Sequence, residues 1–441
     1  MSFIHHDRNN EQVLIPITVI RGGTSRAFFF EGKDVPPQGR GLEEFLLAVR
    51  GSPDPMAMDG LGGDSLLQSK TAIVSPSSRP DADVDYTFVQ IFPDQPATLS
   101  YKMNCGNISS AVPVFALMKD MIPNVADGTV TVRTFSTNTS KMMYMTLEVL
   151  NGEARVAGQT TVGGVPGTGA EVMVDFRDLG GGFTGKLFPT GNLADTIAMD
   201  DGSFVDVTIV DLANLCVFFD PASFGIASTG LELPGPDGTV LGPPGMEDRI
   251  TELRLKVVQR IGWNQYAPDS IRKAALPFAV SVTAPRDYTT MDGGTVHARD
   301  IDLAARFYVE SVMHTAAPGT GSSCLAAAAS IPGTVPNSIL AAGSLKAGKG
   351  GTVTFGHPSW PPDPWQGRSR VLAGNAADEE PNHGCWGKTV EEVLAQELGH
   401  LGVRYQSRRH VEDVGRHGRD DWPLDPLPFV ARPQHDHCQG D

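Results

Sequence analysis

Residues 104 to 117 read Asn-Cys-Gly-Asn-Ile-Ser-Ser-Ala-Val-Pro-Val-Phe-Ala-Leu, a polar turn followed by small and apolar residues. Residues 318 to 329 read Pro-Gly-Thr-Gly-Ser-Ser-Cys-Leu-Ala-Ala-Ala-Ala, with the same order of features. Each run predicts a buried helix that starts at a glycine-containing turn and that strands can approach closely. Two unrelated core helices are the alternative, whereas a duplicated architecture explains both runs together.

Short strands fill most of the remaining chain. With 49 Gly and 33 Pro, turns are frequent, and most apolar runs between them are short and β-branched. Helical patterns are few, at residues 41–50, 107–120, 246–261, 300–314, 320–330 and 390–398. We therefore predict an α+β fold of two pseudo-repeated halves, each a curled β-sheet or barrel around a central α-helix. The halves are predicted at 12–192 and 193–375, followed by a divergent segment, 376–441, that is loop or disorder from about residue 408.

Composition excludes several functional classes. Lys and Arg number 35 against 51 Asp and Glu, and the net charge of -16 argues against binding to nucleic acid or an anionic membrane. No stretch has the length of a membrane span or the pattern of a secretory signal, so we expect a cytoplasmic protein, with mitochondria as the alternative. The five cysteines form no CxxC pair, which favours a reducing compartment and no metal site. His435, His437 and Cys438 are expected in a solvated tail rather than as metal ligands.

Two residues have the chemistry of a proton-transfer site. Cys105 precedes a predicted helix, where unpaired amide groups and the helix dipole stabilise a thiolate or a bound carboxylate. The alternative is a structural cysteine in a polar turn. Lys70 precedes an apolar strand, where desolvation would lower its pKa and make it a base, although a surface lysine is the alternative.

A glycine-flexed turn at 21–25 supplies groups suited to a carboxylate or phosphate. Arg21, Thr24 and Ser25 offer a guanidinium group and hydroxyls there, directly after a predicted strand. The chain has no GxxxxGK[ST] motif and no GxGxxG between a strand and a helix, so nucleotide binding lacks support.

Ten short motifs follow one another across residues 12 to 360. They are Arg21-Gly22-Gly23-Thr24-Ser25, Gly51-Ser52-Pro53-Asp54, Asp59-Gly60-Leu61-Gly62-Gly63, Ser69-Lys70-Thr71-Ala72-Ile73-Val74, Asn104-Cys105-Gly106-Asn107, Pro166-Gly167-Thr168-Gly169-Ala170, Gly185-Lys186-Leu187, Pro189-Thr190-Gly191-Asn192, Ile331-Pro332-Gly333-Thr334-Val335 and Gly356-His357-Pro358-Ser359. In this order the motifs resemble the PrpF family, which includes 2-methylaconitate cis-trans isomerases, oxalomesaconate tautomerases and aconitate delta-isomerases. The resemblance implies a diaminopimelate epimerase-like fold, no metal or organic cofactor, and catalytic roles for Lys70 and Cys105.

The sequence also departs from the pattern of the family. Pro318 stands where epimerases of this fold have a second cysteine, and it cannot transfer a proton. Phe278 stands where many relatives have lysine, and Trp360 stands where glycine usually follows His-Pro-Ser. These changes disfavour a two-thiol racemase and leave the exact acid open.

We predict a cofactor-independent isomerase of unsaturated di- or tricarboxylic acids of the aconitate or methylaconitate type. Lys70 or Cys105 removes an allylic proton, and the return of a proton either shifts the double bond or interconverts cis and trans forms. The predicted substrate-binding residues are Arg21, Thr24, Ser25, Gly63, Asn104, Gly106, Asn107, Ser109, His314, Thr320, Gly321 and Ser322. An amino-acid or hydroxy-acid racemase and a non-catalytic carboxylate-binding protein are the alternatives. The expected partner is a small polycarboxylate, and the candidate assembly is a homodimer.

Overall fold

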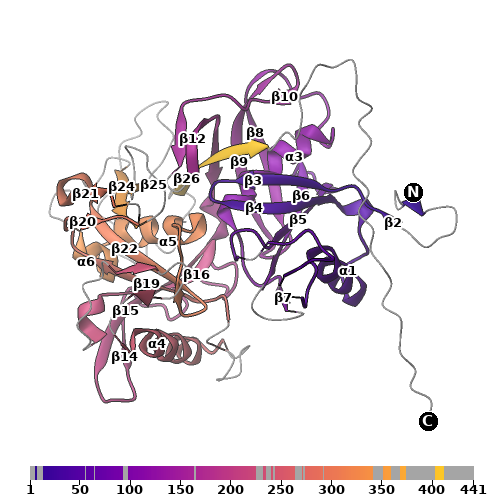
Figure 1. Cartoon of the computed structure of the whole chain (residues 1–441). Helices are drawn as coiled ribbons and strands as arrows, with labels where there is room; N and C mark the ends of the chain where they lie inside the picture. The colour runs from indigo at the N-terminus through magenta and orange to yellow at the C-terminus, as the bar shows by residue number, and fades with distance from the viewer. Residues whose placement is uncertain are drawn as a thin grey trace, which may run out of the picture.

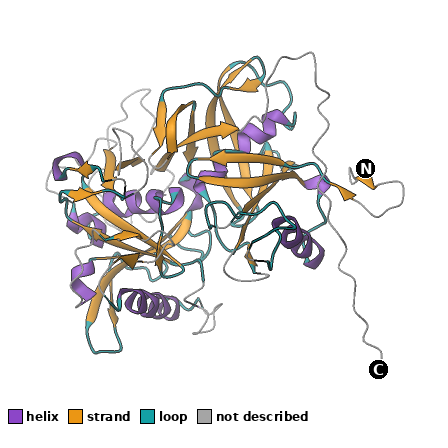
Figure 2. Ribbon diagram, viewed as in Figure 1, coloured by secondary structure: helices purple, strands orange, loops and turns teal. Residues whose placement is uncertain are grey.

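A computed structural model of the chain describes residues 5–6, 13–54, 56–63, 65–92, 98–162, 165–224, 232–234, 240–241, 244–263, 271, 274–291, 293–340, 351–358, 368–373 and 403–411. Figure 1 shows two β-rich halves side by side, an indigo-to-magenta half and a pink-to-orange half, and Figure 2 shows helices within and around the strands. Among the described residues, no helix has both the length and the apolar character needed to span a membrane.

The first half is a closed barrel around a short helical segment. Its strands pair in a ring: β3 (Thr18–Gly22), β4 (Ser25–Glu31), β5 (Lys70–Pro76), β6 (Val84–Ile91), β8 (Gly128–Ser136), β9 (Lys141–Leu150), β13 (Glu171–Asp175) and β26 (Val403–Val411), which returns to β3. The helices α2 (Gly106–Ser109) and α3 (Val112–Met118) lie among the strands, and α1 (Arg40–Arg50) packs on the other face of β4 to β6. Smaller elements are β1 (His5–His6), β2 (Val13–Leu14), β7 (Leu99–Ser100), β10 (Glu153–Ala154), β11 (Thr160–Val162), β12 (Val165–Gly169), η1 (Gly32–Asp34) and η2 (Arg177–Leu179).

The second half is a curled sheet around a longer helix. Its strands are β14 (Asp195–Ala198), β15 (Phe204–Leu212), β16 (Asn214–Phe219), β19 (Phe278–Thr283), β22 (Leu303–Val309), β23 (Val312–Met313), β24 (Gly351–Gly356) and β25 (Arg368–Ala373). The helix α5 (Gly319–Ser330) lies against this sheet, followed by α6 (Val335–Ile339), and α4 (Met246–Arg260) packs on β14 and β19. Smaller elements are β17 (Leu233–Pro234), β18 (Val240–Leu241), β20 (Tyr288–Thr289), β21 (Thr295–Val296), η3 (Pro221–Phe224) and η5 (Ala298–Asp300).

The pairing directions demonstrate the duplication. From β3 through β4, β5, β6, β8 and β9 to β13, successive pairs are antiparallel, parallel, antiparallel, parallel, antiparallel and antiparallel. From β15 through β16, β19, β22, β24 and β25 to β26, the order is identical. In each half a helix follows the second strand of this series, and the central helix follows the fourth. The predicted α+β fold of two similar halves is confirmed, while the exact domain boundaries stay predictions.

The small residues of the central helix are a consequence of close packing. Every residue of α5 from Gly319 to Ala329 is buried. A Cβ added at Gly321 would lie 2.9 Å from the ring of Phe307 on β22. Larger side chains would push the helix away from the sheet, since interiors of this density do not absorb added volume.

Two sequence expectations differ from the structure. The helix expected at 300–314 is wrong, because this segment forms the strand β22 and the short hairpin strand β23. All seven residues of β22 are buried between β19 and β24, and tertiary packing on both faces outweighs the helix propensity of Leu, Ala and Arg. The loop or disorder expected from about residue 408 is also wrong for 408–411. These residues belong to β26, whose backbone joins β13 and β3. The helix expected at 390–398 lies outside the described residues.

Substituting Gly22 tests the close approach between β3 and the helix start. A Cβ at Gly22 would lie 2.0 Å from the Asn107 carbonyl oxygen, so Gly22→Ala is expected to lower the free energy of unfolding by about 1–3 kcal/mol. Gly41 in α1 has nothing within 4 Å of its added Cβ, and Gly41→Ala is expected to stabilise by up to about 1 kcal/mol. Urea denaturation of both variants measures the difference; equal stabilities would contradict the packing described here.

Candidate active site

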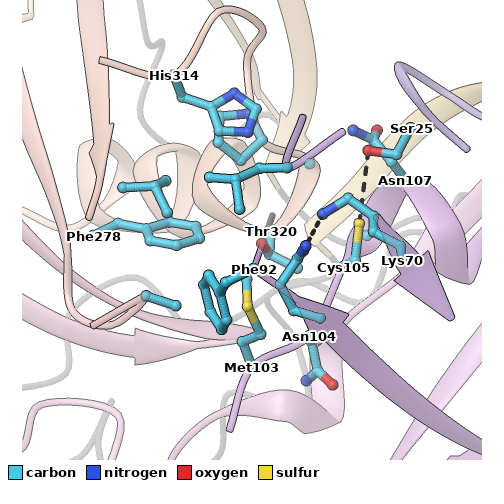
Figure 3. A pocket seen from close by; sticks show the side chains of 17 residues that line it. Ser25, Lys70, Phe92, Met103, Asn104, Cys105, Asn107, Phe278, His314 and Thr320 are labelled. Atoms are coloured by element: carbon cyan, nitrogen blue, oxygen red, sulfur yellow. Dashed lines mark hydrogen bonds between the residues drawn. The ribbon is translucent and has the colours of Figure 1, made fainter. Parts of the chain in front are cut away.

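A pocket lies where the starts of the two central helices meet. A Cβ at Gly106 of α2 would lie 3.1 Å from the backbone nitrogen of Thr320 in α5, so the two helix starts are in contact. The pocket encloses about 450 Å³ of space, including the open solvent at its mouth. Figure 3 shows side chains of both halves converging on it.

Lys70 lies at the first position of β5 and its side chain is buried in this pocket. Its Nζ donates a hydrogen bond to Oε1 of Gln90, 2.6 Å away on the neighbouring strand β6. Nε2 of Gln90 donates to the carbonyl oxygens of Ser69, at 3.1 Å, and Ile91, at 2.9 Å. These two backbone acceptors fix which end of the amide faces Lys70, so the lysine meets a neutral oxygen there.

The surroundings of Lys70 favour its uncharged form. Burial lowers the pKa of Lys70 below its usual value, and the nearby Cys105 and Glu310 oppose this shift only in part. The Nζ also lies 5.5 Å from the ring centroid of Phe88, which offers weak compensation for a charge. A lysine whose pKa is lowered by burial exists as the neutral base in a larger fraction than an exposed lysine does, which suits it to accept a proton.

Cys105 immediately precedes α2 and is 8% exposed. Its Sγ lies 4.0 Å from the hydroxyl oxygen of Ser25, the first residue of β4. Asn107, two residues after Cys105, donates through Nδ2 to the hydroxyl of Thr24 at 2.8 Å and so joins the turn between β3 and β4 to the helix. The thiol therefore lies beside Lys70 on the first half of the protein, as Figure 3 shows.

A single asparagine of the second half holds both helix starts. Oδ1 of Asn214 accepts from the backbone N–H of Asn104 at 2.9 Å, and its Nδ2 donates to the Asn104 carbonyl at 3.0 Å. The same Nδ2 donates to Oγ1 of Thr320 at 2.7 Å. Because Asn104 precedes Cys105, this buried side chain fixes the thiol relative to α5.

His314 reaches the pocket from the loop between β23 and α5. Burial, and then the charge of Lys70, lower the pKa of His314 to about 4, so the imidazole is neutral at physiological pH. Its Nδ1 lies within hydrogen-bonding distance of backbone groups of Ala316. Among the described residues, no group of three or more His, Cys, Asp or Glu side chains is arranged to hold a metal ion.

The structure brings most of the predicted site residues together. Those that line the pocket are Ser25, Lys70, Asn104, Cys105, Gly106, Asn107, His314 and Thr320. Their roles in binding and catalysis stay predictions.

Other predicted residues lie behind the pocket lining. Arg21 precedes Gly22, which faces α2, so the alternation of β3 directs Arg21 to the other face of the sheet. Ser109 donates to the Cys105 carbonyl at 2.9 Å, one turn inside the helix. The remaining predicted residues outside the lining are Thr24, Gly63, Gly321 and Ser322.

The sequence analysis missed Gln90, Asn214 and the apolar lining. Gln90 is the polar residue near the end of the otherwise inward-facing apolar pattern of β6, and this interruption is the signal that could have revealed it. Asn214 follows Ala213, whose φ is 62°, in a tight turn whose partners come from distant parts of the chain. No local pattern reports such partners. The apolar lining includes Phe92, Met103, Ala275 and Val309.

Comparison with known proteins agrees with this geometry. A family profile described as "PrpF protein" matches residues 12–361. The chain belongs to the PrpF family. Relatives of this PrpF-family chain include 3-methylitaconate isomerase of Eubacterium barkeri, 38% identical over 352 residues, 79% of this chain and 90% of the relative. The 2-methyl-aconitate isomerase of Cupriavidus necator is 34% identical, over 79% of this chain and 88% of the relative.

A tautomerase and a solved structure extend the comparison. The 4-oxalomesaconate tautomerase of Pseudomonas putida is 34% identical to the PrpF-family chain, over 79% of this chain and 88% of the relative. A crystal structure of methylitaconate-delta-isomerase is 33% identical and superposes with a TM-score of 0.69, covering 91% of this chain and 94% of that one. The resemblance found in the sequence is therefore confirmed.

Removing the Asn214 side chain tests its role as the link between the helix starts. Asn214→Ala leaves buried groups of Asn104 and Thr320 without their partner, so the free energy of unfolding is expected to fall by about 1–3 kcal/mol. In a double-mutant cycle with Thr320→Val, measured by urea denaturation, the two losses are expected to be non-additive. Strictly additive losses would contradict the shared hydrogen bond.

Proposed function

We propose that this PrpF-family protein isomerises an unsaturated di- or tricarboxylic acid of the aconitate or methylaconitate type by moving a proton along an allylic system. The supporting observation is a buried lysine with a lowered pKa that lies beside a thiol in a pocket at two helix starts. The names of the relatives, which are isomerases and a tautomerase of such acids, support the same reaction class. No observation favours the racemase or the non-catalytic binding protein.

The reaction is difficult because it builds up negative charge on the substrate. Loss of an allylic proton sends the C–H electron pair into the double bond and a carboxylate, which gives a dienolate-like anion on a molecule that is already polyanionic. Gly319 and Thr320 at the start of α5, and Gly106 and Asn107 at the start of α2, line the pocket. The first backbone N–H groups of a helix have no partner within the helix, so these helix starts are suited to stabilise developing negative charge.

Lys70 is suited to be the base that removes this proton. In its neutral form it has a free electron pair, and it becomes an ammonium group beside the new anion, which it then stabilises. Return of a proton to the far carbon, from Lys70 or from Cys105, moves the double bond by one position. Rotation in the intermediate before the return gives cis–trans isomerisation instead. In a second route, Cys105 adds to the alkene and permits rotation with no allylic exchange.

Proton NMR in deuterated water tests the proposal with cis-aconitate, trans-aconitate and 2-methylaconitate. We expect isomerisation of at least one acid with uptake of solvent deuterium at the allylic carbon, and a loss of about 10²–10⁴-fold in Lys70→Ala and Cys105→Ser. Lys33→Ala, at an exposed lysine outside the pocket, serves as the control. Wild-type turnover in both pocket variants would show that the site is misassigned, and cis–trans isomerisation without deuterium uptake and without a shift of the double bond would favour addition of the thiol.

The pH dependence tests the state of Lys70. Because its neutral form is the base, the rate is expected to rise with pH through a pKa below the usual lysine value. Gln90→Glu places a carboxylate beside the ammonium group and raises this pKa, so the rise moves to higher pH. Below both pKa values, each unit of displacement lowers the rate about tenfold.

Gln90→Met is the matched control, since it removes the hydrogen bond without adding a charge. In Gln90→Met, the rate is expected to rise at the same pH as in the wild type or at a lower pH. The other titratable groups near Lys70, namely Cys105, Glu310 and His314, are unchanged in both variants. If the rate of Gln90→Glu rises at the same pH as that of the wild type, Lys70 is excluded as the titrating base.

A further inference from the structure

Strand register identifies which residues of the two halves correspond. Lys70 is the first residue of β5 and pairs with Ala27 on the parallel strand β4. In the second half, Phe278 is the first residue of β19 and pairs with Cys216 on the parallel strand β16. Since β4 and β5 correspond to β16 and β19 in the duplicated order, Phe278 occupies the position of Lys70.

Two further positions follow in the same way. Gln90 is the partner of Lys70 on β6. On β22, Tyr308 is the partner of Ala279, so Val309, the next residue, lies beside Phe278 and corresponds to Gln90.

The third pair comes from the helix starts. Cys105 precedes α2 directly, and Pro318 precedes α5 directly. Both residues line the same pocket, as do the other two corresponding pairs.

The pocket therefore has two chemically different walls. The wall of the first half carries Lys70 and Cys105, whose side chains can exchange protons with a substrate. At the corresponding positions, the wall of the second half presents Phe278, Val309 and Pro318, and none of these side chains has a proton to give or a lone pair to accept one. Figure 3 shows Lys70 and Cys105 together, with Phe278 across the pocket from them.

His314 is the titratable side chain that the second half contributes to the described lining. Its burial keeps it neutral, with a pKa of about 4, which makes it a weak base toward a carbon acid, and a neutral imidazole is a poor proton donor. Glu310, at the turn between β22 and β23, influences the charge of Lys70 but does not line the pocket. Neither residue matches Lys70 as a proton acceptor.

We infer that the planar allylic system of the substrate lies between the two walls, and that its proton leaves and returns on the one face turned toward Lys70 and Cys105. The C–H bond at one end of the allyl system breaks, the double bond moves, and the new C–H bond forms at the other end on the same face. The apolar wall holds the opposite face and excludes water from it. This inference rests on the proposed function and adds the stereochemical course of the reaction.

The course is measured with the acid that turns over in the NMR assay. The two methylene-monodeuterated forms of that acid, of opposite configuration, are first incubated in ordinary water to find which one loses deuterium. The unlabelled acid is then incubated in deuterated water, and the configuration of the newly formed CHD carbon is read at low conversion. Together the two results show whether the proton is removed from, and returned to, the same face of the allylic system.

The expected result is a single configuration that corresponds to same-face transfer. Opposite-face transfer, or a mixed configuration at low conversion, would overturn the inference while leaving the isomerase proposal intact. Absence of both turnover and deuterium exchange with every acid would remove the proposed function, and the inference with it.

A variant isolates the competing donor. If His314 donated the proton to the face opposite Lys70, the wild type would show opposite-face transfer. His314→Gln would then lose incorporation of deuterium at the receiving carbon. The inference instead expects same-face transfer in the residual activity of His314→Gln. Because the wild-type measurement is decisive by itself, misfolding of the variant would not obscure the result.

Discussion

The hydrogen bonds of Asn214 are the contacts on which the geometry of the site depends. One buried amide group binds both backbone groups of Asn104 and the hydroxyl of Thr320, and so connects the residue before the thiol to the first turn of α5. The two halves share the strand β26, which pairs with β25 of the second half and with β13 and β3 of the first, but each half has its own central helix. A site at their junction requires a fixed distance between the helix starts, and satisfied buried hydrogen bonds supply it because breaking them is costly.

The charge state of Lys70 also depends on one neighbouring side chain. Gln90 gives Lys70 a hydrogen-bond acceptor without a negative charge, and its own orientation is fixed by backbone carbonyl groups. A carboxylate at this position would hold the lysine as an ammonium ion, whereas an apolar residue would leave the amine without a defined orientation. An amide combines a defined position with a lowered pKa, which is what a lysine base requires.

The two halves share a fold but present different side chains to the pocket. The order of strand pairs is the same in both halves, yet the corresponding positions carry Lys70 in one and Phe278 in the other. Duplication supplies a pocket with two similar walls, because each central helix begins at the same point of its sheet. The apolar residues at the corresponding positions of the second wall make the pocket chemically unsymmetrical, although the strands of the two halves pair in the same order.

The sequence by itself determined the α+β class and the two central helices, because small-residue runs and glycine turns are local signals of close packing. Lys70 and Cys105 were singled out by the resemblance to the PrpF family, and the tertiary structure places both in one pocket. The sequence did not determine the strand at 303–309, where burial on both faces outweighs local propensity, or the joining of residues 403–411 to the first barrel. The tertiary structure alone decided that Gln90 faces Lys70 and that Asn214 links the helix starts. Those contacts join residues distant in the chain, and no local pattern encodes them.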